Sequence, residues 1–289
     1  MIRKLVSAPP VSAERREARG LVYALLLAAP VVILAFYFFL PPGVDWYDGT
    51  GLAIRTPLHP YQIESFHYPP WFALFLSPLG LLPSRLGQAI NAYLNLSVAM
   101  LVVFTRRGKP LALALVGTSL PMAALLLNAN VEWVPMLAFL LPPAWGLPLL
   151  ATKPQSGGLA ALLWLKQEKN RTRLLLPAVG VGLLSLAIWG WWLPTAIGGR
   201  PLTQEANAAP WPWAIPLGLA LLVLAWRRED ELLAVGATLC LVPYYVIHSA
   251  TLGFALLAAR YPRLAAAVWL ALWCGAIAKN WLLLFPAAG

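Results

Sequence analysis

Charged residues are scarce in this chain of 289 residues, of which only 11% are Asp, Glu, Lys or Arg. A soluble domain carries about 25% charged residues. The composition is instead apolar, with 60% hydrophobic residues and a mean hydropathy of +0.71. Long apolar stretches with few charges are typical of membrane spans. The composition therefore excludes an ordinary soluble domain and predicts an all-α, polytopic membrane protein.

Acidic residues are the scarcer of the two charge types, with 11 Asp and Glu against 21 Lys and Arg, and the net charge is +10. A basic excess can indicate nucleic-acid binding. Here, however, the basic residues form short clusters between apolar runs, as in cytoplasmic loops that contact anionic headgroups. We therefore exclude nucleic acid as a partner, and we interpret residues 1–20 as a basic tail on the cytoplasmic side.

Cysteine and histidine are also rare, with two Cys and three His residues in the chain. Cys240 and Cys274 lie inside apolar runs. Their spacing is not that of metal ligands, and there is no loop that a disulfide between them would close. Asp45 and Asp48 are three positions apart, but no histidine or third carboxylate is close to them in sequence. We therefore predict no metal site and no cofactor.

Apolar runs and basic clusters alternate along the chain, which predicts one integral membrane domain over residues 1–289. We expect about nine to eleven membrane segments, no internal repeat and no separate soluble domain. The clearest expected spans cover residues 21–40, 88–105, 111–127, 174–193, 213–226, 232–248 and 264–285. Basic clusters at 106–109, 166–173, 227–231 and 260–263 are predicted to be cytoplasmic loops. The segment at 41–68 is predicted to be an outer loop.

The apolar run at residues 68–83, "YPPWFALFLSPLGLLP", contains four prolines. Proline removes a backbone donor and breaks helices. If this run crossed the membrane, the basic cluster at 106–109 would face outside, so we predict a re-entrant or interfacial segment. Irregular backbone at membrane depth is tolerated only where protein or a wet cavity covers it. The run therefore indicates a cavity.

Two of the rare acids, Asp45 and Asp48, lie in "VDWYDGTG" directly after the first apolar run. One interpretation is a solvated loop in which Asp48 and Gly49 form a turn. The other is a carboxylate held beside a dry pocket, where a raised pKa suits a general base. The residues alone leave both open.

The segment from Asp45 to Pro83 resembles the amino-terminal signature of glycosyltransferase family 87. The matching positions are Asp45, Tyr47, Pro60-Tyr61, Tyr68-Pro69-Pro70 and Leu82-Pro83. Two further stretches, "TKPQ" at 152–155 and "LNAN" at 127–130, resemble motifs of the same family, and the likeness covers roughly residues 20–170.

This resemblance implies a C-type glycosyltransferase fold in the plasma membrane, with the N-terminus in the cytoplasm. It implies transfer of a mannose-like hexose, with inversion, from a polyprenyl-phosphate donor to a hydroxyl of a glycolipid or polysaccharide at the outer face. Asp45 would be the general base, with Asp48 as its substitute. The residues expected to bind donor phosphate or sugar are Lys153, Gln155, His248, Arg55, His67 and Tyr68.

Simpler roles stay open for several of these side chains. Lys153 can reach lipid headgroups, Arg55 can anchor the interface, and His248 can cap the end of a span. Two other functions also stay open. One is a lipid or sugar flippase or transporter, since transporters use broken helices and charges inside the membrane. The other is a non-catalytic membrane subunit.

Overall fold

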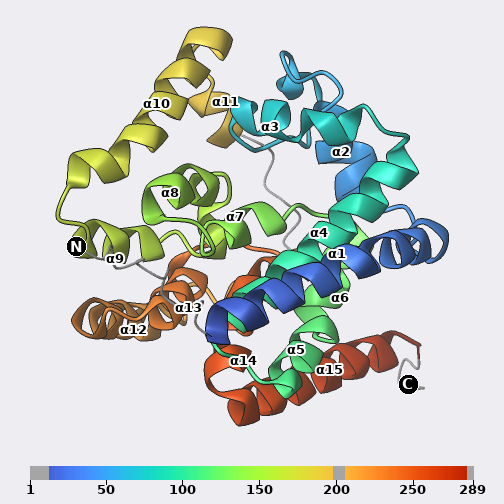
Figure 1. Ribbon diagram of the computed structural model, residues 1–289, viewed down its shortest axis with the longest axis vertical. Coiled ribbons are helices and arrows are strands. Elements are labelled where there is room, and N and C mark those ends of the chain that lie inside the picture. Colours follow the sequence, from blue (N-terminus) through green and yellow to red (C-terminus); the bar gives the residue numbers. More distant parts are fainter. Residues whose placement is uncertain (1–12, 198–205, 285–289) are drawn as a thin grey trace, which may run out of the picture.

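The computed structural model describes residues 13–197 and 206–284, and every regular element in these ranges is helical (Figure 1). The α-helices are α1 (Ala13–Phe39), α2 (Thr50–Ala53), α3 (Pro70–Gly80), α4 (Ser84–Thr105), α5 (Pro110–Gly117), α6 (Leu120–Asn128), α7 (Trp133–Leu137), α8 (Pro143–Ala151), α9 (Ala160–Gln167), α10 (Arg171–Trp189), α11 (Leu193–Ile197), α12 (Ile215–Arg228), α13 (Glu231–Leu241), α14 (Thr251–Arg260) and α15 (Pro262–Leu284). Shorter turns are η1 (Asp45–Gly49), η2 (Pro60–Gln62), η3 (Pro154–Ser156) and η5 (Ile247–Ala250). The all-α prediction is confirmed for this part of the chain.

Proline and short polar side chains set many of the helix boundaries. α3, α5 and α8 each begin with proline, whose missing N–H is not needed in the first turn. Ser119, Asn170 and Asp230 precede α6, α10 and α13, and each side chain accepts a hydrogen bond from a backbone N–H of the first turn. The abundance of proline therefore produces many short helices rather than a few long ones.

In the described part of the chain, three helices are long and apolar enough to cross a membrane: α1 over Gly20–Phe39, α4 and α10. The pair α5 and α6, which is bent by 47°, raises the number to four if it counts as one span. Several apolar helices can therefore span a membrane, as the composition predicts. Single helices of spanning length are fewer than the nine to eleven membrane segments expected, because proline-rich runs are divided into shorter pieces.

Two of the expected segments differ from continuous spans. α3 has 11 residues and is thus about 16 Å long, roughly half the thickness of a hydrocarbon core. The span expected at 232–248 ends as a helix at Leu241, because Val242 is extended and precedes Pro243. His248 consequently lies in η5 and not at the end of a straight helix.

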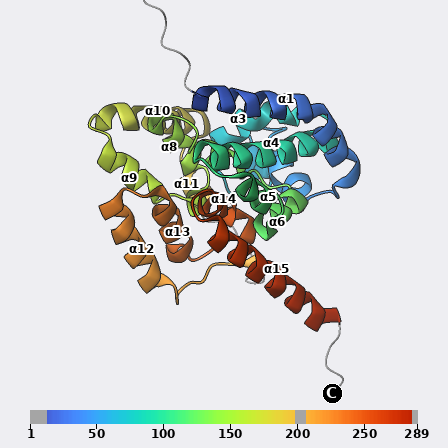
Figure 2. The ribbon, with the colours of Figure 1, turned by 60° about the horizontal axis from the view of Figure 1, so that its bottom comes forward.

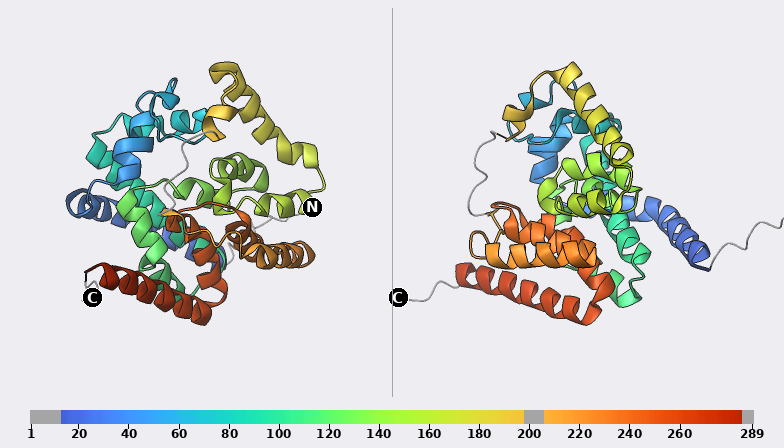
Figure 3. Two further views of the ribbon diagram at one scale, coloured as in Figure 1. Left: turned by 180° about the vertical axis from the view of Figure 1, so that it is seen from behind. Right: turned by 90° about the vertical axis from the view of Figure 1, so that its left-hand side faces the viewer.

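α4 forms the centre of the fold, and 61% of its apolar window is buried. It contacts α1, α3, α5, α6, α7 and α14 and runs through the middle of the view in Figure 1. By contrast, no residue in the apolar window of α1 is fully buried, although the helix packs against α4, and α1 extends away from the body in the side view of Figure 3. α15 likewise extends beyond the other helices towards the C-terminal end (Figure 2). Exposed apolar helices of this kind suit contact with lipid.

The four loops predicted to be cytoplasmic lie next to one another. Three ion pairs connect them: Arg106 with Glu231 at 2.5 Å, Lys166 with Glu229 at 3.0 Å, and Arg260 with Asp230. Of the predicted basic tail at 1–20, residues 1–12 lie outside the described part and the remainder forms the beginning of α1.

Candidate functional site

Side chains of α4 fix the chain that leads from α1 to Asp45. Arg85 donates to the carbonyl oxygens of Tyr37 at 2.5 Å and Phe38 at 3.2 Å, at the C-terminal end of α1. A cation at this end of a helix also interacts favourably with the helix dipole. One turn further along, Gln88 donates to the carbonyl of Pro41 at 2.7 Å. The first residues of the predicted outer loop are therefore held against α4.

Gly43 allows this loop to pass close to the end of α6. A Cβ atom at Gly43 would lie 2.5 Å from the Cβ of Ala129 and 2.7 Å from the carbonyl oxygen of Asn128. Only glycine permits such an approach without displacement of the backbone. Two residues later, Asp45 Oδ2 accepts a hydrogen bond of 2.7 Å from Asn130 Nδ2. The close approach thus brings the loop acid to the "LNAN" stretch.

Two asparagines one turn apart on α4 support the segment from Ala129 to Trp133. Asn91 Nδ2 donates to the Ala129 carbonyl at 3.1 Å, and Asn95 Nδ2 donates to the Asn130 carbonyl at 2.7 Å. Both asparagines are fully buried. The side-chain oxygen of Asn95 accepts from the backbone N–H of Trp133 at 2.8 Å, and that of Asn91 accepts from the Trp133 indole at 2.9 Å. Both side-chain amides therefore use their NH2 group and their oxygen to orient one loop.

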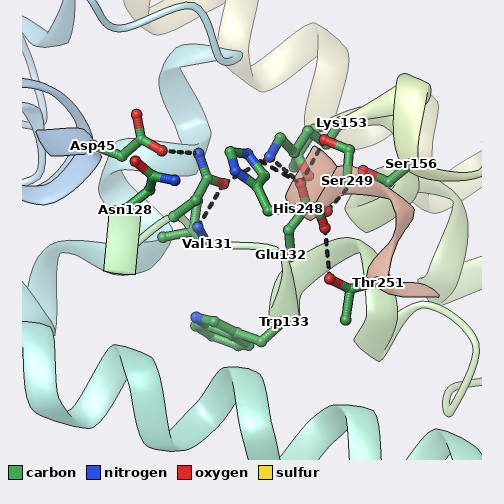
Figure 4. Close-up of polar contacts among 12 residues, drawn as sticks. Asp45, Asn128, Val131, Glu132, Trp133, Lys153, Ser156, His248, Ser249 and Thr251 are labelled. Atoms are coloured by element: carbon green, nitrogen blue, oxygen red, sulfur yellow. Dashed lines mark hydrogen bonds and ion pairs between the residues drawn. The ribbon is translucent and has the colours of Figure 1, made fainter. Parts of the chain in front are cut away.

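This support turns Trp133 towards α4 and leaves Glu132 facing the opposite way (Figure 4). Glu132 is 1% exposed and forms an ion pair with Lys153, which is 4% exposed. The hydroxyls of Ser156 and Ser249 donate to the Glu132 carboxylate at 2.7 and 2.9 Å. Buried charges are tolerated when they are paired and hydrogen-bonded in this way.

Lys153 also joins this pair to Asp45. Its ammonium donates to Asn130 Oδ1 at 2.6 Å, while Asn130 Nδ2 donates to Asp45. Asn130 therefore lies between the carboxylate of Asp45 and the Lys153–Glu132 pair. Next to them, His248 Nε2 is 3.9 Å from Glu132 Oε1, and His248 Nδ1 is buried without a hydrogen-bond partner in the described residues.

A cavity of about 420 Å³ opens beside this polar cluster. Six of the predicted site residues line it: Asp45, His67, Tyr68, Lys153, Gln155 and His248. They come from the loop at 41–68, from η3 and from η5, which are far apart in sequence. Pro69, Pro154, Leu193 and Val246 contribute apolar walls. An apolar pocket with a few convergent polar groups is the usual form of a small-molecule site.

Two predicted site residues, Asp48 and Arg55, are not among the described residues that line this cavity. The side chain of Asp48 is exposed, and its backbone carbonyl accepts a hydrogen bond from Ser65. Arg55 donates to the Leu82 carbonyl at 3.1 Å and to Ser84 Oγ at 2.8 Å. Arg55 thereby ties the outer loop to the turn between α3 and α4.

Trp46, the residue after Asp45, is 2% exposed and packs inside the protein. Its indole N–H donates to the Ser84 carbonyl at 3.0 Å, and its ring lies against Gly87. Sequence reasoning missed Glu132, Ser249, Trp192 and Tyr244. The only signal available for Glu132 was the rarity of acids in apolar surroundings, where an ionisable side chain is expected to have a role.

Burial sets the protonation of the loop groups at the cavity. It raises the pKa of Asp45, and the hydrogen bond from Asn130 and the charge of Lys153 offset this effect only in part. Burial also lowers the pKa of His67, which favours the neutral imidazole. A carboxylate with a raised pKa is a stronger base than an exposed one and is able to accept a proton from a hydroxyl.

Within residues 13–197 and 206–284, no group of three His, Cys, Asp or Glu side chains is arranged to hold a metal ion. Comparisons with models of protein families, with curated proteins and with solved structures find no match to this chain. The chemistry of the site therefore has to be argued from its own geometry.

Proposed function

We propose that this protein is an integral membrane glycosyltransferase of the C-type fold, in which Asp45 is the general base. It would transfer a mannose-like hexose, with inversion, from a polyprenyl-phosphate donor to a hydroxyl of a glycolipid or polysaccharide. The observation that carries the proposal is the cavity itself. It gathers Asp45, Lys153 and Gln155 from separate motifs that resemble those of family 87.

The geometry suits the proton transfer that this reaction needs. Asn130 engages Asp45 Oδ2, and no hydrogen bond among the described residues engages Oδ1. Figure 4 shows this second oxygen pointing away from Asn130. In the proposed step the acceptor oxygen forms a bond to the anomeric carbon, and its proton passes to Asp45. The bond from that carbon to the lipid phosphate breaks, and the phosphate leaves with the electron pair.

The leaving phosphate requires hydrogen-bond donors as its charge grows. Lys153 uses two of its ammonium protons, one towards Asn130 and one towards Glu132. The third proton remains for a ligand. Gln155, half-buried at the cavity wall, would supply an amide. These are the roles we propose for the Lys-Pro-Gln stretch.

The arrangement of charges supports an outer-face site in a multi-pass plasma-membrane protein. The basic loops are joined by the pairs that involve Arg106, Lys166 and Arg260. Many of the described residues that line the cavity lie in the loop at 41–68, or at the ends of the expected spans 174–193 and 232–248 that are remote from these basic loops. With the short and bent helices counted as parts of spans, we retain nine to eleven membrane segments and a cytoplasmic N-terminus in this proposal.

The test measures release of polyprenyl phosphate by the full-length protein in lipid nanodiscs, with a panel of polyprenyl-phosphate sugars and extracted glycolipid acceptors. Asp45→Asn should lower the rate by about 100-fold or more, as is usual when a general base is removed. Asp48→Asn is the matched control, because Asp48 is exposed and away from the cavity. It should leave the rate unchanged.

Equal rates for wild type and Asp45→Asn would refute the assignment of the base. Binding of donor by the wild type without release of polyprenyl phosphate would refute the transferase and favour a lipid flippase. Absence of donor binding would favour a non-catalytic subunit.

A further inference from the structure

Three residues that line the cavity each carry a buried hydrogen-bonding atom without a partner in the described part of the chain. These atoms are Trp192 Nε1, Tyr244 OH and His248 Nδ1. All three residues line the cavity beside Asp45, and all three atoms are withdrawn from solvent. Buried polar groups in folded proteins nearly always have a hydrogen-bond partner, so each exception calls for an explanation.

The positions of these atoms are not scattered through the molecule. Among the described residues, the only other buried side-chain polar atoms without a partner are the hydroxyls of Ser97 and Ser185. These two belong to α4 and α10 and do not line the cavity. Trp192 immediately precedes α11, whereas Tyr244 and His248 lie between α13 and α14. Two separate segments of the chain therefore bring unsatisfied groups to one cavity.

We infer that Trp192, Tyr244 and His248 form a subsite for the hydroxyl oxygens of the sugar that is transferred, a role distinct from binding its phosphate. This inference rests on the proposed function and specifies its substrate. The indole N–H is only a donor, the phenol both donates and accepts, and the imidazole Nδ1 does either according to its tautomer. A sugar, whose hydroxyls both donate and accept, satisfies all three.

The charges around the cavity favour a neutral ligand at this subsite. Lys153 is the only cationic side chain among the described lining residues apart from the histidines, and Glu132 already neutralises it. Asp45 adds a carboxylate on the other side of Asn130. The proposed function assigns Lys153 to the phosphate of the donor, so no second lysine or arginine among the described lining residues is left to face a charged group at Trp192, Tyr244 and His248. Burial of an unpaired charge there would be unfavourable. Neutral hydroxyl groups meet no such penalty.

The experiment compares citronellyl phosphate, used as its singly charged methyl ester, with its mannosyl, glucosyl and arabinofuranosyl esters, so that all four probes carry the same charge and differ in the sugar. Their Kd values are measured by calorimetry on the full-length protein in nanodiscs. We expect the wild type to bind at least one glycosyl ester more tightly than citronellyl phosphate. The ratio of the two Kd values is the contribution of the sugar.

Tyr244→Phe and Trp192→Phe each remove one hydrogen-bonding group and retain an aromatic ring. Each variant should reduce the sugar contribution by about 2- to 10-fold, the usual worth of one hydrogen bond, and leave the Kd of citronellyl phosphate unchanged. Ser185→Ala is the matched control, because it removes an equally unpartnered hydroxyl away from the cavity. It should change neither Kd.

Three results would overturn the inference: equal loss of affinity for the methyl and glycosyl esters, which would assign the groups to the phosphate; an unchanged ratio in the variants; or no sugar contribution in the wild type. The outcome is separate from that of the proposed function, because binding does not require turnover. A sugar contribution that the variants reduce, in a protein that releases no polyprenyl phosphate, would retain the subsite and refute the transferase.

Discussion

Replacement of Lys153 by Met should destabilise the protein strongly, because it leaves the carboxylate of Glu132 buried without its counter-charge. Glu132 is 1% exposed, and its remaining partners are the hydroxyls of Ser156 at 2.7 Å and Ser249 at 2.9 Å. Removal of one member of a buried pair costs about 3–5 kcal/mol of unfolding free energy. Met retains the length and apolar volume of the lysine stem, so the loss of charge dominates the effect.

Two further variants separate this charge effect from a general effect of lysine removal. Lys166 pairs with Glu229 at 3.0 Å, but their side chains are 29% and 48% exposed. Exposed pairs contribute about 0–1 kcal/mol, so Lys166→Met should have a small effect. The double variant Lys153→Met with Glu132→Gln removes both buried charges. Its loss of stability should be smaller than the sum of the single losses by up to about 3 kcal/mol.

The assay is equilibrium unfolding by SDS in mixed micelles, followed by circular dichroism and tryptophan fluorescence. Loss of stability in Lys153→Met that is no larger than in Lys166→Met would refute the reasoning. Strict additivity of Lys153→Met and Glu132→Gln would also refute it, because independent groups do not form a pair.

Three other predictions concern the loop acid and its support. Burial raises the pKa of Asp45 above the ordinary 3.8, so a rate that depends on its carboxylate should fall with decreasing pH at a midpoint above 3.8. A pH profile of kcat/KM measures this midpoint, and a midpoint at the ordinary value contradicts the prediction. Gly43→Ala should lower stability by about 1–3 kcal/mol, because its Cβ would lie 2.5 Å from that of Ala129. Its control, Gly180→Ala, places the Cβ in open space on a helix and should stabilise slightly, so equal effects in SDS unfolding refute the close approach. Asn95→Leu should lower both stability and transfer rate, because the Asn130 carbonyl and the Trp133 backbone N–H each lose their hydrogen bond to Asn95. An unchanged unfolding midpoint would show that Asn95 does not hold the loop.

Local chemistry in the sequence predicted the helical class and the presence of several apolar helices long enough to cross a membrane. These features depend on composition and on proline, which act over short distances. The sequence did not predict that the expected span at 232–248 ends at Leu241 and places His248 in a separate turn. An apolar run alone does not reveal at which residue a helix ends and an extended stretch begins.

Part of the candidate site could also be predicted from the sequence. Asp45, Lys153 and His248 were named on motif or position, and the structure brings them to one cavity. Asn91 and Asn95 were not named, although asparagines four positions apart in an apolar helix lie on one face. Their spacing shows a shared face, but only the folded chain shows which loop they hold.

Glu132 is the residue that most changes the interpretation of the site, and no local pattern connects it to Lys153. The two lie 21 positions apart, with α7 and α8 between them. Since Lys153 neutralises a buried carboxylate, loss of activity in a Lys153 variant does not by itself demonstrate contact with a phosphate: the same substitution destabilises the loop that carries Asn130. Asp45→Asn is the more decisive variant. The oxygen of the introduced asparagine can still accept the hydrogen bond from Asn130. The substitution removes a half-buried charge and leaves no other buried charge without its partner. A loss of transfer at unchanged stability in that variant is therefore attributable to the missing base.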